Sequence, residues 1–272
     1  MTYILRNQLF PSLGLAIIFT AFWTGSFAQD GERQELHNPV VYMKGTIYDF
    51  FKPGGKWGWD LDVVYRRQSQ LGETSLSDRL SEPLRYSIRP WLAWQPTKYT
   101  RVSFNPIGMF NSAPRFARVE DLDGNWEREA RTTLQINHAA YYYRLNFTHR
   151  LRFESRWRGI DQPEGPDHNW RVRYRMRLRI PLNTDYFYTN KTWYISLYSE
   201  MHVEFGAEYG RNNFSQNRNY AGLGYRFWDW ARMELGYVHQ YNIRGNTDLV
   251  DFTNGPMFYI FVDYLSALKL SR

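Results

Sequence analysis

The amino-acid sequence predicts an all-β protein that forms a transmembrane, up-and-down antiparallel β-barrel preceded by a cleaved signal peptide. Three observations favour this fold. Apolar and polar residues alternate with a period of two, the alternating segments are long, and their connections alternate between tight turns and long polar loops. A period of two places successive side chains on opposite faces of a strand, and a tilted strand needs about ten residues to cross a hydrocarbon layer.

The first 28 residues have the composition of a secretory signal peptide. Before Asp30 the only charged groups are Arg6 and the amino terminus, and an apolar stretch runs from Leu13 to Trp23. A basic start, a short apolar core and an exit on small residues are typical of export signals. The apolar stretch is too short to span a bilayer, which argues against a retained anchor. We therefore expect a signal peptide at 1–28 and one outer-membrane barrel domain at 29–272.

Composition excludes several classes of protein. The chain has 272 residues, a formal net charge of +7, an aromatic content of 18% and no cysteine. The absence of cysteine excludes a disulfide scaffold, a thiolate metal site, a cysteine nucleophile and a lipid-anchored lipoprotein. The many aromatic residues argue against disorder, because such a chain can bury much apolar surface. After residue 28 no segment is long and apolar enough to predict a transmembrane helix.

In the first part of the chain, alternation predicts strands at 57–68, 84–95 and 99–110, with a weaker candidate from Val40 to Phe50. Asp60 and Asp62 lie opposite the apolar residues of the first of these strands. Arg85 and Arg89 lie opposite the apolar residues of the second. Each of these segments therefore has one apolar face and one face that carries charge.

The middle of the chain alternates most regularly, and it predicts strands at 130–143, 147–158 and 170–181. In Trp170–Ile180, with the sequence WRVRYRMRLRI, five arginines alternate with six apolar residues. As a strand, this segment has one wholly cationic face and one wholly apolar face. A helix would distribute the same arginines around its circumference.

Four further strands are predicted at 192–205, 214–227, 230–242 and 257–265. In the first of them, Glu200, His202 and Glu204 share the polar face. In the second and third, Arg226 and Glu234 also lie opposite apolar residues. The pattern of apolar and charged faces thus continues to the end of the chain.

Connections between the predicted strands alternate in length. Tight turns are expected at 95–98, 145–146 and 228–230, and long polar loops at 69–83, 111–129, 159–169, 206–213 and 243–256. This pattern is typical of a meander with its long loops at one end. Closed bacterial barrels normally have an even number of strands. We therefore expect ten strands with both termini in the periplasm, or twelve if Val40–Phe50 and one further segment also cross.

A soluble β-protein also alternates, but it buries its apolar face. Two features favour a membrane barrel with the apolar face outward: charge is concentrated on one face of successive strands, and aromatic residues gather near the tight turns. These aromatic residues are Trp57, Trp59, Trp91, Trp94, Tyr141, Tyr142, Tyr143, Trp193, Tyr194, Trp228 and Trp230. We therefore expect an outer-membrane location, with a secreted soluble β-protein that has a binding role as an alternative.

From Glu129 onward the chain resembles the outer-membrane family known as domain of unknown function 2490. The stretches that carry the resemblance are HRLRFESRW (His149–Trp157), WRVRYRMRLRIPL (Trp170–Leu182), YSEMHVEFG (Tyr198–Gly206), QNRNYAGLGYRF (Gln216–Phe227) and MELGYVHQ (Met233–Gln240). The resemblance implies a β-barrel of Gram-negative outer membranes, and it implies no particular activity.

The inward face of such a barrel is rich in arginine and glutamate. The residues expected to line the lumen are Arg150, Arg152, Glu154, Arg156, Arg171, Arg173, Arg175, Arg177, Arg179, Glu200, His202, Glu204, Arg218, Arg226, Arg232 and Glu234. Two functions are compatible with this lining: an ion-paired filling that stiffens a structural barrel, and a small pore whose surplus arginines favour anions. The expected partners are outer-membrane lipid and, for a pore, small anionic solutes. Nucleic acid is not expected, because the arginines face inward.

A lipid-modifying outer-membrane hydrolase is the alternative function. Such enzymes carry histidine and serine two positions apart on one strand, but none of the six histidines here has serine two positions later. No other catalytic motif is present. Asp121, Asp123 and Asn125 are spaced as in a calcium loop, but Thr132 stands where the twelfth-position glutamate is needed. We therefore expect no catalytic residue, cofactor or metal site, and the oligomeric state stays open.

Overall fold

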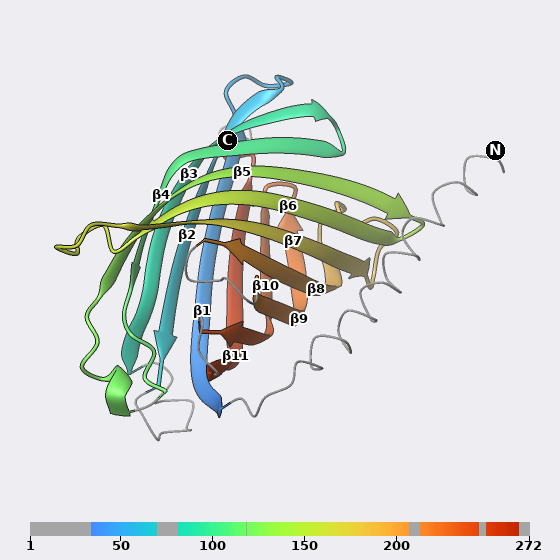
Figure 1. Ribbon diagram of the computed structural model, residues 1–272. Coiled ribbons are helices and arrows are strands. Elements are labelled where there is room, and N and C mark those ends of the chain that lie inside the picture. The colour runs from blue at the N-terminus through green and yellow to red at the C-terminus, as the bar shows by residue number, and fades with distance from the viewer. Residues whose placement is uncertain (1–33, 70–80, 118, 207–212, 245–248, 267–272) are drawn as a thin grey trace. The chain divides into compact units, whose positions relative to one another are not determined.

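The computed structural model describes residues 34–69, 81–117, 119–206, 213–244 and 249–266, which form a closed β-barrel of eleven strands (Figure 1). The predicted signal peptide lies outside the described residues. The strands are β1 Gln34–Phe50, β2 Trp57–Gln68, β3 Glu82–Thr97, β4 Thr100–Ser112, β5 Glu127–Tyr142, β6 Leu145–Arg158, β7 Asp167–Pro181, β8 Thr192–Phe205, β9 Phe214–Trp228, β10 Ala231–Ile243 and β11 Leu249–Asp263. A 3-10 turn, η2, spans Val119–Asp121. Within the described ranges, no helix has the length and apolar character needed to cross a membrane.

Consecutive strands pair antiparallel around the barrel, which confirms the up-and-down arrangement. Each predicted strand is present, and the weaker candidate Val40–Phe50 lies within β1. The expected number of ten or twelve strands is wrong, because the described chain forms eleven. An even number is required only when every neighbouring pair is antiparallel. Here β1 and β11 run parallel and pair with each other, so an odd number of strands closes the sheet.

The odd strand number separates the two ends of the described chain. Gln34 aligns with Leu249 at the end of the barrel that carries the long loops, and Tyr48 aligns with Asp263 at the end with the tight turns. The chain therefore enters β1 at the long-loop end and leaves β11 at the tight-turn end (Figure 1). The predicted placement of both termini on one side lies outside the described residues, but within them Gln34 and Ser266 lie at opposite ends of the barrel.

The barrel has an apolar exterior and a charged interior. Exterior side chains such as Ile88, Leu92 and Tyr237 are exposed, and Leu235 reaches 61% exposure. Charged side chains of the same strands are buried. The interior also contains an apolar and aromatic cluster formed by Val40, Tyr42, Leu84, Tyr198, Tyr220, Val238, Met257, Tyr259 and Phe261. A soluble protein usually has the opposite distribution of charged and apolar residues.

Aromatic residues near the tight turns divide between the two faces. Trp94, Trp193 and Trp228 are exposed on the exterior, as expected. Trp91 and Tyr194 are only 4% and 0% exposed and lie in the interior, so they do not belong to an exterior aromatic belt. Trp91 is three positions from Trp94, and Tyr194 is one position from Trp193. Because side chains alternate between the two faces of a strand, an odd difference in position places each of them on the inward face.

The seam, as we call the parallel contact between β1 and β11, is interrupted at Gly255 and Pro256. These residues do not pair with Val40 and Val41, although the register is regular on both sides. Proline has no N–H to donate to the ladder. A Cβ atom on Gly255 would lie 1.6 Å from the backbone oxygen of Val40. The two backbones thus approach at a distance that only glycine permits.

We expect Gly255→Ala to lower the free energy of unfolding by about 1–3 kcal/mol, or to prevent closure, because the added methyl group must push the seam apart. Denaturant titration of the folded barrel in detergent measures this change. Gly45→Ala in β1 is the control, since a Cβ atom there meets nothing within 4 Å. Equal stability of the two variants would contradict the account of the seam.

Candidate functional site

The residues predicted to line the lumen lie in the interior on β6 to β10. All of them are buried except Arg175 and Arg232, which are half-buried. Alternation explains this placement, because each predicted residue has the parity of the inward face of its strand. The interior of the barrel is therefore the candidate functional site.

Arginines of β7 connect carboxylates of the strands on either side. Arg173 donates from Nη1 to Glu154 Oε1 at 2.9 Å and from Nη2 to Glu200 Oε2 at 2.8 Å. Arg171 donates from Nε to Glu154 Oε2 at 2.7 Å and from Nη1 to Glu204 Oε1 at 3.4 Å. These charge-assisted hydrogen bonds couple β6, β7 and β8 across the interior wall.

The network continues to β5 through Glu129. Both Nε and Nη2 of Arg131 donate to Glu129 at 2.6 Å, in a bidentate pair. Arg156 binds Glu129 and also donates from Nη1 to Glu204 Oε2 at 2.7 Å. One continuous set of ion pairs thus spans four neighbouring strands.

A second group of ion pairs lies toward the tight-turn end. Tyr194 donates its hydroxyl to Glu234 Oε1 at 3.1 Å, and Arg177 and Arg179 lie 3.7 Å from the same oxygen. Nearby, Asp263 pairs with Arg232 and Arg226. These four arginines therefore share two carboxylates. Glu234 was among the predicted lumen residues, whereas Asp263 was not predicted.

A third group of ion pairs lies on β1 to β3, and it was not predicted from the sequence. Asp62 accepts a hydrogen bond from Thr46 at 2.7 Å and lies 3.0 Å from Arg89 and 3.4 Å from Lys44. The signal was present, because Asp62 and Arg89 lie opposite apolar residues in their predicted strands. Lys44 was missed because alternation in β1 is weak.

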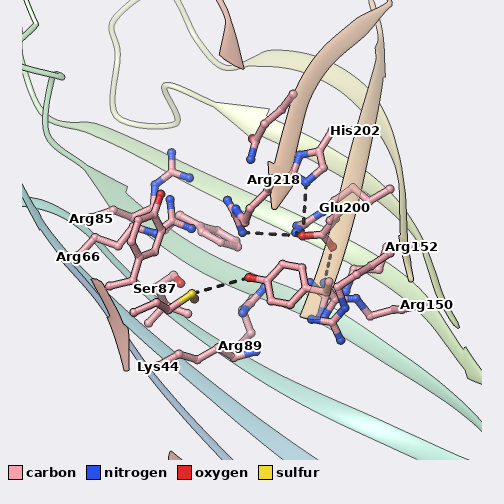
Figure 2. A pocket seen from close by; sticks show the side chains of 18 of the residues that line it. Lys44, Arg66, Arg85, Ser87, Arg89, Arg150, Arg152, Glu200, His202 and Arg218 are labelled. Carbon is pink, nitrogen blue, oxygen red and sulfur yellow. Dashed lines mark hydrogen bonds and ion pairs between the residues drawn. The ribbon is translucent and has the colours of Figure 1, made fainter. Parts of the chain in front are cut away.

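A cavity of about 60 Å³ lies within the interior (Figure 2). We call it the small cavity. Its lining includes eleven cationic side chains and one carboxylate, that of Glu200. The cationic residues are Lys44, Arg66, Arg85, Arg89, Arg131, Arg150, Arg152, Arg171, Arg173, Arg175 and Arg218. Because roughly 10–15 Å³ of such volume is enough for one water molecule, the small cavity has room for several.

Three arginines of the small cavity have no carboxylate within ion-pair distance among the described residues. Arg66 lies over the ring of Tyr42, 4.5 Å from its centroid. Arg85 donates from Nε to the hydroxyl of Ser112 at 2.6 Å. Arg175 lies over an aromatic ring 5.3 Å away. The ion pairs of the interior therefore leave part of its positive charge uncompensated by this part of the protein.

A larger cavity of about 210 Å³ adjoins the small cavity. Eight cationic side chains and three aspartates line it. Both cavities contact the same layer of residues, formed by Lys44, Arg150, Arg152, Arg175 and Tyr259. We call these residues the shared layer. Four of its five side chains are cationic.

Each end of the interior is partly covered by a connecting segment. At the tight-turn end, Phe187 between β7 and β8 is 2% exposed and lies over the guanidinium groups of Arg179 and Arg226. At the long-loop end, Arg244 binds Asp121 of η2 and Asp251 of β11. These contacts hold loop residues against the strand ends.

One pair of residues on the outer face has the geometry of a catalytic dyad. Ser155 Oγ lies 2.8 Å from His168 Nε2, and the two come from the paired strands β6 and β7. The ring of His168 lies between those of Trp157 and Trp170, with centroids 5.2 and 5.3 Å away. The search for histidine and serine on one strand could not find this pair, because it forms across two strands.

His202 is buried and its Nε2 atom lies 3.5 Å from Glu200. Within the described ranges, no group of three or more histidine, aspartate or glutamate side chains is arranged to hold a metal ion. The interior contacts are therefore those of arginines with carboxylates, tyrosines and amides.

The fold and the interior define a class of protein: a closed β-barrel with an apolar exterior and an arginine-rich interior. The chain belongs to the family described as Protein of unknown function (DUF2490), whose model matches residues 40–251. This match confirms the resemblance found in the sequence, and it covers the chain from β1 to the beginning of β11. No curated protein and no solved structure matches the chain.

We expect Glu154→Gln to lower the free energy of unfolding by about 3–5 kcal/mol, because it leaves Arg171 and Arg173 buried with one fewer carboxylate. Denaturant titration in detergent measures the difference. Glu164→Gln, an identical change on an exposed loop, is the control and should alter stability by less than about 0.5 kcal/mol. A Glu154 variant as stable as this control would show that the network contributes little.

Proposed function

We propose that the protein is an outer-membrane β-barrel that provides a narrow, anion-selective passage, and that residues 1–28 direct its export. The exterior supports a membrane location. Large apolar side chains are exposed on the exterior of successive strands, as with Leu92, Leu197, Leu223 and Leu235. Exposed apolar surface on this scale needs a partner, and lipid provides one for a closed barrel whose backbone groups pair internally.

The single observation that carries the anion preference is the lining of the small cavity, with eleven cationic side chains against one carboxylate. A cationic constriction lowers the free energy of a negative solute and raises that of a positive one. Carboxylates that face the network, such as Glu154 and Glu129, are already bound by arginines. Because each ion pair neutralises both of its partners, the field experienced by a passing solute comes mainly from Arg66, Arg85 and Arg175, which have no carboxylate partner among the described residues.

The composition of the interior also bears on the alternative of a purely structural filling. A filling that only stiffens the barrel is most stable when each buried cation has a carboxylate, because an unpaired buried charge is costly. Arg66, Arg85 and Arg175 depart from this rule within the described residues. A secreted soluble β-protein is disfavoured by the exposed apolar exterior.

The two cavities limit the size of the solute. They hold about 60 and 210 Å³ and adjoin at the shared layer. Since the small cavity has room for only several water molecules, it accommodates small ions that have lost much of their hydration, but not oligosaccharides or peptides. A solute that passes from one cavity to the other would meet the shared layer, and Arg175 is its half-buried member from β7.

We expect the protein in planar bilayers to give stepwise currents whose reversal potential in asymmetric KCl indicates a preference for chloride. Arg175→Glu should abolish or invert this preference, because it changes the charge of the shared layer by two units. Arg128→Glu makes the same change at a side chain that is 63% exposed, and it should leave the preference intact.

Two results would contradict the proposal. Absence of current in all salts would indicate a plugged barrel. Unchanged ion selectivity in Arg175→Glu would show that the shared layer does not determine the selectivity of the passage. A folded control, recognised by its resistance to denaturant, is needed for each variant.

A second candidate function is hydrolysis of lipid esters, and one observation favours it: the contact between Ser155 and His168 on the outer face. In such a reaction, Ser155 Oγ would attack the ester carbonyl carbon while His168 Nε2 accepts its proton. His168 would then give this proton to the alcohol oxygen as the ester C–O bond breaks, and water would hydrolyse the acyl-serine to release the fatty acid. Trp157 and Trp170 flank the histidine, and tryptophans of barrels often lie at the lipid–water interface.

If this second candidate is correct, the detergent-solubilised protein should release fatty acid from phospholipid in mixed micelles. Ser155→Ala should reduce the rate about 1,000-fold or to background, because it removes the nucleophile. Ser199→Ala, a half-buried serine on the outer face of β8, is the control. No turnover by the parent protein, or equal turnover by Ser155→Ala, would eliminate the candidate.

A further inference from the structure

Arg66 and Arg85 form a like-charge pair in the wall of the small cavity. They are directly opposite each other in the register of β2 and β3. Figure 2 shows them together on one side of the cavity, with Glu200 and His202 on the other side. Like charges directly opposite on neighbouring strands destabilise a sheet. A barrel that retains this pair in its interior needs a compensating negative charge.

The protein does not supply that charge from the adjoining strands. Along the same row, Arg66 aligns with Tyr42 of β1, and Arg85 aligns with Ser112 of β4. Both neighbours are uncharged. Within the described ranges, Arg66 makes no hydrogen bond, its Nε atom is buried without a partner, and Arg85 binds only Ser112. The remaining guanidinium N–H groups are therefore available to a ligand.

Gln216 provides a second, independent indication of a ligand. Its side chain lines the small cavity, is 6% exposed, and has a buried Nε2 atom that finds no hydrogen-bond partner in the described part of the chain. A buried amide without a partner costs free energy, and most such groups in proteins bind water or a ligand. Arg66, Arg85 and Gln216 all offer donors, which suit an acceptor-rich ligand.

We infer that the small cavity binds a doubly charged oxyanion, namely a phosphate group, with Arg66 and Arg85 as its principal ligands. Guanidinium forks match the oxygens of a phosphate in bidentate geometry. Two cations that have no carboxylate partner among the described residues favour a dianion over chloride, and a volume of about 60 Å³ suits an ion with few atoms. This inference rests on the proposed anion passage and names the class of solute that it selects.

Equilibrium binding tests the inference without any measurement of current. Inorganic phosphate is titrated against the full chain in detergent at constant ionic strength, with chloride replaced stepwise. We expect saturable binding and a rise of the melting temperature, because a ligand that binds only the folded state stabilises it. The double variant Arg66→Gln, Arg85→Gln should bind phosphate about tenfold more weakly or worse. Because the like-charge pair is removed, this variant should be no less stable than the parent without phosphate.

Arg232→Gln is the matched control, since Arg232 is a half-buried interior arginine that lines only the larger cavity. It should retain phosphate binding. Arg66→Lys keeps the charge but loses the fork, and it should weaken phosphate binding while the anion preference of the current persists. Should the double variant fail to fold, this single variant provides the same comparison.

Parallel titration with glycerol 3-phosphate distinguishes free phosphate from a phosphate monoester as the ligand, and tighter binding of either identifies the source. Binding of neither, or equal binding by the parent and the double variant, overturns the inference. Phosphate binding without any current would support the phosphate site and contradict the proposed passage. Anion-selective current without phosphate binding would support the passage and contradict the phosphate site.

Discussion

The barrel depends on the neutralisation of guanidinium groups that are held away from bulk water. Removing a cation from water costs several kcal/mol unless a carboxylate or another acceptor replaces its hydration. Arg173 shows how the sheet meets this requirement, since it reaches Glu154 on one neighbouring strand and Glu200 on the other. Strand register therefore determines which charges are compensated, and arginines such as Arg66 have no carboxylate partner within the described part of the chain.

Much of the fold follows from alternation alone. In β7, every second residue from Arg171 to Arg179 is arginine, and this parity determines which side chains are inside. Alternation gives the face of a residue but not its partner. The bonds of Glu154 could be anticipated because its strand and β7 are joined directly, whereas those of Asp263 with Arg232 require the position of the last strand. Lys44 was missed because β1 alternates weakly, whereas Asp62 already had the parity of the inward face of β2 and lacked only a known partner.

The errors also have physical causes. The strand number was wrong because the rule of even numbers assumes antiparallel closure, and no pattern within β1 or β11 reveals a parallel neighbour. Trp91 was grouped with the other aromatic residues near the tight turns on the basis of residue type, although its parity directs it inward. The contact between Ser155 and His168 arises from the pairing of β6 with β7, which brings together residues that are thirteen positions apart in sequence. Properties that depend on which strands meet are the ones that a single sequence conceals.

The parallel seam between β1 and β11 determines on which sides of a membrane the two ends of the described chain would lie. If the barrel spans a bilayer, its eleven strands place Gln34 and Ser266 in different aqueous spaces. A label attached at Gln34 would then face one solution, and a label attached at Ser266 would face the other. Insertion of such a barrel would have to move one of these two residues through the membrane.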